Sequence, residues 1–156
     1  MTELKGKKNK YIILAAGCFW SIQFEFSKLP GVLSTQVGYT DGHLKSPSYA
    51  QVCSGQTNHT EAVMILYNPN IITLRKILEV FFNIHNPSLN SLKKQYQSII
   101  FYHNLYQRDL AKRIITEMNK KRKYIIMTQI KLESIFYLAE EYHQNYLIKN
   151  KVKKCI

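Results

Sequence analysis

A short apolar run that ends in a glycine and a cysteine constrains the fold of this chain most strongly. Residues 11–16 are apolar throughout and have the length of a buried strand. Gly17 then permits a tight change of direction, and residues 21–29 have the apolar spacing of an amphipathic helix that ends at Pro30. We therefore expect a strand to lead almost directly into a helix, with Cys18 at the junction.

The position of Cys18 allows two interpretations. Unpaired N–H groups and the positive end of the helix dipole favour a thiolate at the start of a helix, which lowers the pKa of a cysteine there. A structural cysteine that fills a corner of the core would occupy the same place, since free cysteine is among the most buried residue types. The local sequence alone leaves both a reactive and a structural Cys18 open.

Length and composition predict one globular domain. A chain of 156 residues can bury a sizeable core, and 46% apolar against 21% charged residues is an ordinary globular composition. The three cysteines form no Cys-x-x-Cys pair, so we expect neither a disulfide framework nor a zinc site, and a reducing, cytoplasmic location fits best. A metal at Cys53 and His59 would need two further ligands, and we expect none.

The charge and the N-terminus suggest two other classes of protein, which we consider less fitting. The formal charge of +12 would suit a nucleic-acid partner, but the lysines are spread along the chain without a recognised binding motif, so none is expected. The basic residues 5–10 and the following apolar run resemble a lipoprotein signal, yet the run is too short for one. No run is long enough to span a bilayer, and we expect no membrane association.

Strands and helices alternate along the rest of the chain. We expect helices after the N-cap Thr73 and at residues 106–121, and strands at residues 32–36, 62–67, 95–101 and 125–132. Residues 37–42 and 46–49 have the composition of turns and loops. One strand follows another without an intervening helix, which predicts an α+β fold with a mixed sheet. The domain is expected at residues 11–150, between a flexible basic N-terminus (1–10) and a flexible C-terminal tail (151–156).

Several residues could together form a redox site. Cys18 would be the nucleophile, and Glu61, at the entrance of a strand, would be the acid, although an acid there is more often solvated. Loop tyrosines would donate hydroxyl hydrogen bonds, Phe19 and Trp20 would form an apolar wall, and a second cysteine stands on the tail. No motif of a competing hydrolase, nucleotide site or metal site is present in the sequence.

The ordered motifs resemble one known family. Gly17-Cys18-Phe19-Trp20 is similar to the signature of the A-type peptide methionine sulfoxide reductases, and the likeness covers nearly all of residues 11–150. Further motifs continue it in register: Val37-Gly-Tyr-Thr, Thr57-Asn-His-Thr-Glu61, His85-Asn-Pro, Gln95-Tyr96-Gln-Ser and Ala139-Glu-Glu-Tyr-His-Gln. The resemblance implies a two-layer α+β fold, related to the ferredoxin-like folds.

It also implies an activity and a partner. Methionine-S-sulfoxide, free or within proteins, would be reduced by attack of the Cys18 thiolate, which leaves a sulfenic acid on Cys18. Cys155 lies where many members carry a resolving cysteine that forms a disulfide, and thioredoxin is the usual electron donor. We accordingly expect a monomer that uses thioredoxin or another dithiol as reductant and needs no bound cofactor or metal.

The resemblance assigns roles to the remaining site residues. Glu61 matches the acid that protonates the leaving oxygen, for which an apolar pocket must keep the carboxyl neutral. Tyr49 and Tyr96 match the hydroxyls that hold this oxygen. Phe19 and Trp20 match the aromatic pair that cradles the methyl group of the substrate.

The sequence also departs from the family pattern. Gln23 replaces a usual glutamate, Ser21 and Asn58 replace glycines, and residues 86–96 are shorter than the corresponding glycine-rich loop and lack its aspartate. Cys53 lies in an internal motif of the family, and we interpret it as structural. The departures favour a reduced activity, and the alternative hypothesis is a weakened or non-catalytic relative that acts as a binding module.

Overall fold

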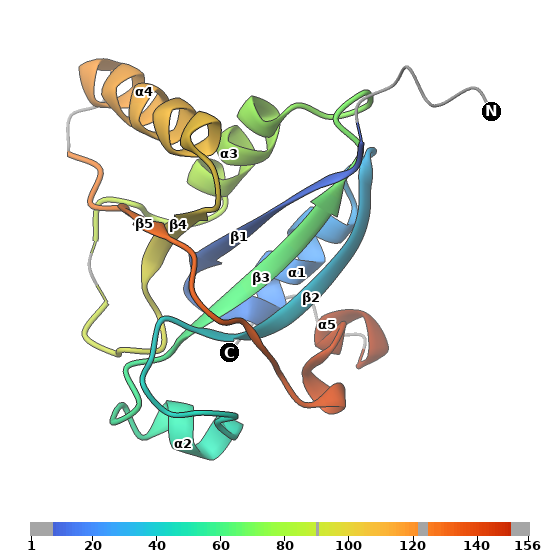
Figure 1. The fold of residues 1–156 in the computed structure, drawn as a ribbon, viewed down its shortest axis with the longest axis vertical. Coiled ribbons are helices and arrows are strands. Elements are labelled where there is room, and N and C mark those ends of the chain that lie inside the picture. Colours follow the sequence, from blue (N-terminus) through green and yellow to red (C-terminus); the bar gives the residue numbers. More distant parts are fainter. Residues whose placement is uncertain (1–7, 90, 122–124, 151–156) are drawn as a thin grey trace.

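The core of the protein is a mixed β-sheet with helices packed on one face (Figure 1). The computed structural model describes residues 8–89, 91–121 and 125–150. Within these residues the sheet has six strands in the order β5-β4-β1-β3-β2-β6, where β1 is antiparallel to β3 and β4, and β4 is parallel to β5. The strands are β1 (Lys10–Ala16), β2 (Val32–Thr40), β3 (Thr60–Tyr67), β4 (Ser98–Tyr102), β5 (Gln129–Leu132) and β6 (Tyr137–Leu138). The expected α+β fold with a mixed sheet is confirmed.

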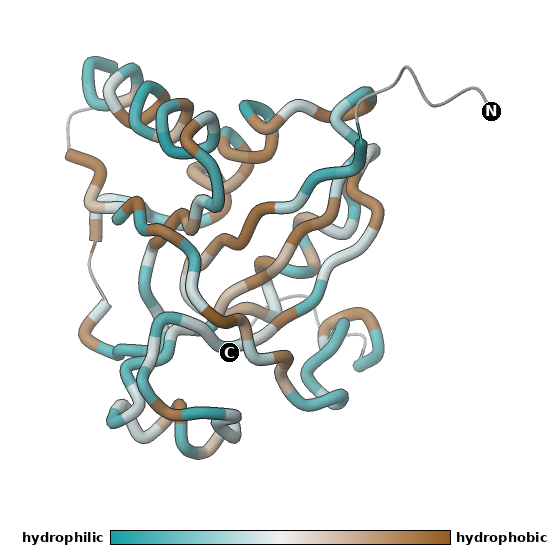
Figure 2. The backbone as a smooth tube through the Cα atoms, viewed as in Figure 1, coloured by the Kyte–Doolittle hydropathy of each residue, from teal (hydrophilic) through white to brown (hydrophobic). Residues whose placement is uncertain are grey.

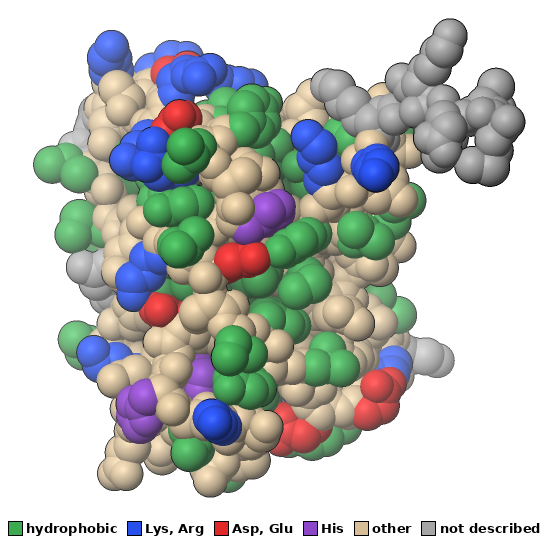
Figure 3. Space-filling view, in the orientation of Figure 1, with side chains coloured by type: hydrophobic (Ala, Val, Ile, Leu, Met, Phe, Trp, Pro, Cys, Tyr) green, Lys and Arg blue, Asp and Glu red, His purple; other side chains and the backbone are tan. Residues whose placement is uncertain are grey.

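The helices connect the strands and end the described chain. They are α1 (Phe19–Ser27), α2 (Tyr49–Cys53), α3 (Leu74–Asn83), α4 (Leu105–Lys121) and α5 (Tyr146–Lys149), with a 3₁₀ helix (Glu141–His143) before α5. None of the helices in the described ranges is long and apolar enough to cross a membrane. On the face shown in Figure 3, Lys and Arg side chains gather over α4 and are scattered elsewhere.

The alternation of side chains along β1 builds a core on both faces of the sheet. Ile12 and Leu14 belong to the large cluster that includes the buried faces of α1, α3 and α4. Ile13 and Ala15 point to the opposite face, where Phe136 packs against a smaller cluster. The chain between β5 and β6 runs across this second face (Figure 1), and the hydrophobic residues concentrate on the central strands (Figure 2).

Helix α3 follows the sequence pattern most closely. The Thr73 side chain accepts a hydrogen bond from the Lys76 N–H at 3.1 Å, which confirms the expected N-cap. Every apolar residue expected on its inner face is buried: Leu74, Ile77, Leu78, Phe81 and Phe82. Helix and cap are therefore determined by local sequence and by one amphipathic face.

Strand β2 is longer than the sequence predicts. We expect turns after Gln36, but the strand continues to Thr40 because both of its edges are paired there. Tyr39 lies opposite Glu61 of β3 and also pairs with Tyr137 of β6. Gly38 suits this place because an added Cβ would lie 2.5 Å from the Phe136 ring.

The expected strands at 95–101 and 125–132 both begin three or four residues late. The backbone before β4 turns away, since the carbonyl of Gln95 accepts the N–H of Glu61 at 2.8 Å. Before β5, the N–H of Ile126 bonds to the Asn119 side chain and that of Met127 to the Pro87 carbonyl. The partners are Glu61 of β3, the Asn119 side chain of α4 and Pro87, so none of these groups takes part in the pairing of β4 with β1 or of β5 with β4.

Helix α2 begins at Tyr49, the last residue of a segment (46–49) that we expect to be a loop. The Ser48 side chain accepts the Gln51 N–H at 3.2 Å, and the Gln51 side chain accepts the Ser48 N–H at 2.9 Å. This reciprocal pair is a capping box, whose Ser-x-x-Gln pattern is visible in the sequence. As a result Tyr49 is the first residue of a helix.

Candidate active site

Cys18 lies at the turn between β1 and α1. Gly17 has φ +87°, a left-handed conformation that favours glycine, and the turn brings the chain directly into the helix. The helix begins at Phe19, two residues earlier than expected, so Cys18 is itself the N-cap residue, with φ −61° and ψ 120°. The junction predicted from the sequence is present, and it is tighter than predicted.

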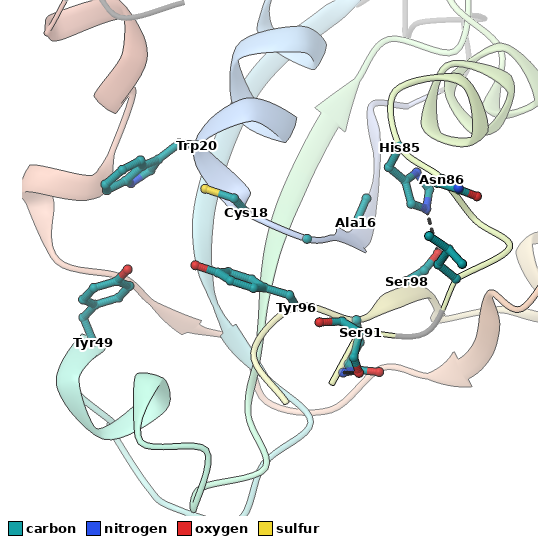
Figure 4. Close-up of a pocket in the computed structure, with 12 residues that line it drawn as sticks. Ala16, Cys18, Trp20, Tyr49, His85, Asn86, Ser91, Tyr96 and Ser98 are labelled. Atoms are coloured by element: carbon teal, nitrogen blue, oxygen red, sulfur yellow. Dashed lines mark hydrogen bonds between the residues drawn. The ribbon is translucent and has the colours of Figure 1, made fainter. Parts of the chain in front are cut away.

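A cavity of about 630 Å³ opens beside this turn. Its lining comes from the β1–α1 turn, α2 and the chain around β4: Ala16, Gly17, Cys18, Trp20, Tyr49, His85, Asn86, Leu89, Ser91, Tyr96, Gln97 and Ser98. In Figure 4 the sulfur of Cys18, the Trp20 ring and the hydroxyls of Tyr49 and Tyr96 surround a common space. The structure thus brings four of the expected site residues together.

Glu61 is buried directly behind the start of α1. The carboxyl is on the helix side of β3, with only 1% of the residue exposed, so the solvated interpretation is wrong. Its Oε1 accepts the Phe19 N–H at 3.2 Å, and its Oε2 accepts the Gln95 side-chain N–H at 3.4 Å. Burial raises the pKa of Glu61 to about 7, against the lowering effect of these two hydrogen bonds. The carboxyl can therefore hold a proton near neutral pH.

The two tyrosines remain hydroxyl donors at neutral pH. Burial raises the pKa of Tyr49, and the neighbouring Cys53 and Glu61 raise it further. Burial also raises the pKa of Tyr96, and the negative charge of Glu61 adds to the effect. Both hydroxyls can donate hydrogen bonds to an oxygen atom in the cavity.

Trp20 is held in place by the C-terminal part of the chain. Its indole N–H donates to Nδ1 of His143 at 2.9 Å, and its ring stacks on Tyr146 at a centroid distance of 3.7 Å. Burial lowers the pKa of His143, which keeps the imidazole neutral and able to accept this hydrogen bond. Trp20 therefore forms a rigid wall of the cavity.

Phe19 takes a different place from Trp20. Its side chain is 1% exposed, lies outside the cavity lining, and contacts Tyr39 and His143 from within the core. Its backbone N–H binds Glu61, as described above. Phe19 thus supports the site from behind, and the structure does not bring its ring to the cavity.

Three polar residues of the site had no role in the sequence analysis. Glu140 accepts the Tyr49 N–H at 2.9 Å and the Tyr39 hydroxyl at 2.8 Å, and His143 holds Trp20. Gln95 contacts Glu61 through its side chain and through its backbone carbonyl. All three residues belong to sequence motifs that resemble the family, and this membership could have indicated a role in the site. The contacts that they make depend on the fold and are not visible in the sequence.

Cys53 and His59 have separate hydrogen-bond partners. Cys53 is exposed, with a free thiol that accepts a hydrogen bond from the Gln95 side chain at 3.2 Å, so it is not a core residue. His59 is buried, and its two ring nitrogens contact Gly42 N and Leu44 O, which ties down the loop after β2. In the described part of the chain no group of three His, Cys, Asp or Glu residues could hold a metal. Cys155 lies outside the described residues.

Comparison with known proteins identifies the family. A family model described as peptide methionine sulfoxide reductase matches residues 10–156. The chain belongs to this family. It is 43% identical over 148 residues to the peptide methionine sulfoxide reductase MsrA of Methanothermobacter thermautotrophicus, an alignment that covers 90% of this chain and 87% of the relative.

Solved structures of Mxr1 from Saccharomyces cerevisiae have the same fold. The reduced form has a TM-score of 0.88 and 34% identity, and the match covers 99% of this chain and 93% of Mxr1. Mxr1 in complex with Trx2 has a TM-score of 0.65 and 27% identity, and that match covers 93% of this chain and 91% of Mxr1. The two-layer architecture expected from the family resemblance is thereby confirmed.

Two of the departures from the family pattern have a local explanation. Gln23 is buried, where its Oε1 accepts the Asn145 N–H at 2.7 Å and its Nε2 donates to the Thr35 carbonyl at 3.1 Å. A glutamate could make the second contact only when protonated, so the amide suits this site. Asn58 has φ +59°, a conformation that asparagine tolerates better than most residues other than glycine.

The shorter segment of residues 86–96 still borders the cavity of this reductase. It contributes Asn86, Leu89, Ser91 and Tyr96 to the lining. No aspartate occurs in this stretch of the sequence. The hydrogen-bonding groups on this side are therefore amide and hydroxyl groups, without a carboxylate.

Proposed function

We propose that this chain reduces methionine-S-sulfoxide to methionine, with Cys18 as the nucleophile and Glu61 as the proton donor. Both free and protein-bound methionine sulfoxide would be substrates. The proposal is supported above all by one observation: a carboxyl with a pKa of about 7 is buried against the first N–H of α1, next to the cysteine that begins this helix. Cys18 lines the cavity and the Glu61 carboxyl is buried behind it, which supports an acid next to a nucleophile.

In the proposed reaction an oxygen atom moves from the substrate to the enzyme. The Cys18 thiolate attacks the sulfoxide sulfur while Glu61 gives its proton to the oxygen, and the hydroxyls of Tyr49 and Tyr96 hold that oxygen. Trp20 contacts the methyl group, with Phe19 packed behind the site. Methionine then leaves with two more electrons than the sulfoxide, and Cys18, oxidised by two electrons, is left as a sulfenic acid.

The enzyme must then be reduced. Cys155 would attack the Cys18 sulfenic acid, so that a disulfide forms and the oxygen leaves as water. A dithiol such as thioredoxin would reduce this disulfide, and no bound cofactor is required. The complex of the related Mxr1 with Trx2 supports thioredoxin as the donor. We propose that the protein works as a monomer in the cytoplasm, where such dithiols are available.

The reductase step is tested with purified protein, dithiothreitol and the two epimers of a methionine sulfoxide peptide. We expect the S epimer to be consumed and the R epimer to remain. Cys18→Ser should abolish turnover because a hydroxyl without a strong base is a poor nucleophile toward sulfur. Turnover by Cys18→Ser would contradict the mechanism, and no turnover by the native chain would favour the alternative of a binding module.

The recycling step is tested with Cys155→Ser. We expect about one methionine per enzyme without reductant, loss of thioredoxin-dependent turnover, and largely retained turnover with dithiothreitol. Peptide mapping of the native chain after one equivalent of substrate should find Cys18 joined to Cys155. Cys53→Ser is the matched control, and a bridge from Cys18 to Cys53 would show that the tail cysteine is not the resolving residue.

A further inference from the structure

The cavity extends well beyond the four residues that surround the proposed reaction centre. Trp20 and Tyr49 stand at one end, with Cys18 and Tyr96 beside them, and His85 marks the other end, past Ala16 (Figure 4). A volume of about 630 Å³ lies in the range of pockets that hold whole small ligands, and one methionine sulfoxide side chain fills only part of it. The second end is therefore available to another part of a bound peptide.

This second end, which we name the side lobe, is lined by Ala16, His85, Asn86 and Ser98 (Figure 4), and we include their sequence neighbours Gly17 and Leu89, which also line the cavity. A Cβ added to Gly17 would meet nothing within 4 Å, so the backbone here faces open space. Leu89 is 66% exposed and contributes the largest apolar side chain of the lobe. The lobe thus offers room and apolar surface that a ligand can cover.

Two polar side chains of the side lobe, His85 and Ser98, are already paired with the protein. His85 Nδ1 donates to the Phe81 carbonyl at 2.7 Å, and Nε2 accepts from the Ser98 hydroxyl at 2.7 Å. The Ser98 oxygen also lies 2.7 Å from the Thr128 hydroxyl. Burial lowers the pKa of His85, so its ring is neutral at neutral pH. None of the six lobe residues carries a charge, and a charged ligand group would lose hydration without gaining an ion pair from them.

We propose that the side lobe is a specificity subsite that binds an apolar side chain next to the methionine sulfoxide in a peptide substrate. The inference rests on the proposed function, since it uses the reaction centre at Cys18 as the anchor. Adjacent Cα atoms are about 3.8 Å apart, so a neighbouring residue can enter a lobe that is continuous with the reaction centre. An apolar side chain there covers Leu89 and gains the free energy of apolar burial.

The proposal is tested with peptides of the form acetyl-X-Met(S-oxide)-X-amide, in which X is Leu, Gly, Asp or Lys. The same residue stands on both sides, so the result does not depend on the direction of binding. We expect kcat/KM for X = Leu to exceed that for X = Gly by roughly tenfold or more, since even one methylene in an apolar pocket can give discrimination of that order. Asp and Lys should not exceed Gly.

Two variants in neighbouring positions test whether the side lobe causes the preference for Leu over Gly. Leu89→Asp should bring the Leu to Gly ratio of kcat/KM close to one. Leu92→Asp is the matched control, because Leu92 is fully exposed and lies outside the cavity lining, and it should keep the native ratio. Both residues are exposed, so neither change threatens folding.

The possible outcomes distinguish failure of the subsite proposal from failure of the proposed function. Equal kcat/KM for all four peptides, a preference for Asp, or loss of the Leu preference in Leu92→Asp would each overturn the subsite, even with full activity on N-acetylmethionine sulfoxide. Absence of turnover on N-acetylmethionine sulfoxide itself would instead overturn the proposed function.

Discussion

At the scale of single residues, Gln95 forms hydrogen bonds with both the side chain and the backbone of Glu61. The Gln95 side chain donates to Oε2 of Glu61, and the Gln95 carbonyl accepts hydrogen bonds from the Glu61 N–H and the Thr60 hydroxyl. Gln95 also immediately precedes Tyr96, whose hydroxyl faces the cavity. One residue therefore positions the proposed acid and one of the proposed oxygen ligands.

Replacement of Gln95 by leucine should shift the pH dependence of the reaction. Glu61 must be protonated to act as the acid, so kcat/KM should fall as the pH rises through about 7. Gln95→Leu removes a donor that favours the carboxylate, which raises the pKa of Glu61 further and moves this alkaline limb to higher pH. The pH profile of kcat/KM, measured with dithiothreitol as reductant, gives the position of the limb.

The matched control for this experiment is Cys53→Ser. It alters the other acceptor of the Gln95 side chain and should leave the alkaline limb where it is. A lower rate for Gln95→Leu at an unchanged limb would mean that Gln95 has only a structural role.

At the scale of elements, the segment from β6 to α5 closes one side of the site. Its Gln144 side chain continues the pairing of β6 along β2, since it accepts the Val37 N–H at 3.0 Å and donates to the Val37 carbonyl at 2.9 Å. Glu140 and His143 of the same segment hold Tyr49 and Trp20. The docking of this segment therefore controls two walls of the cavity.

Gln144→Ala should loosen this segment. The variant loses both bonds to Val37 and a third to the Ala139 carbonyl, and we expect a loss of about 1–3 kcal/mol in the free energy of unfolding. KM for a methionine sulfoxide peptide should rise because Trp20 and Tyr49 lose their support. Urea unfolding and steady-state kinetics measure the two effects. Gln129→Ala, at an exposed position of β5, should change neither, and a native KM in Gln144→Ala would show that the segment does not shape the site.

At the scale of the whole molecule, the burial of Glu61 makes the free energy of unfolding depend on pH, because the ionised carboxyl is disfavoured in the folded protein. The folded-state pKa of Glu61 is about 7, above the ordinary value of 4.5, so the folded protein holds this proton more tightly than the unfolded chain. The resulting stabilisation is complete below pH 4.5 and is lost as the pH rises to 7 and beyond. The fold tolerates this penalty because the large apolar cluster around α1 and α3 supplies far more burial than one carboxyl removes.

Glu61→Gln should abolish this dependence. Between pH 5 and pH 8 the native protein should lose about 2–3 kcal/mol of unfolding free energy through Glu61, and the variant should lack that part of the loss. Urea unfolding at both pH values, for both proteins, provides the comparison, and the difference between the two pH values cancels any constant effect of the amide. An identical pH dependence in both proteins would show that Glu61 has an ordinary pKa.

The sequence determined the features that depend on neighbouring residues. The apolar run, Gly17 and the helical spacing after it predicted the junction at Cys18, and the period of α3 with its Thr73 cap predicted that helix. The motifs in register predicted the family. These features follow from backbone preferences and from one apolar face, which a single stretch of sequence displays.

Only the tertiary structure decided which polar residues meet at the site. Glu61 stands at the start of β3, and its burial depends on α1 covering that end of the sheet, 42 residues away along the chain. The contacts of Gln95 and His143 likewise join segments that are distant in sequence. Hydrogen bonds and pKa shifts depend on burial and distance in space, and local sequence specifies neither until the strands have paired and the helices have packed.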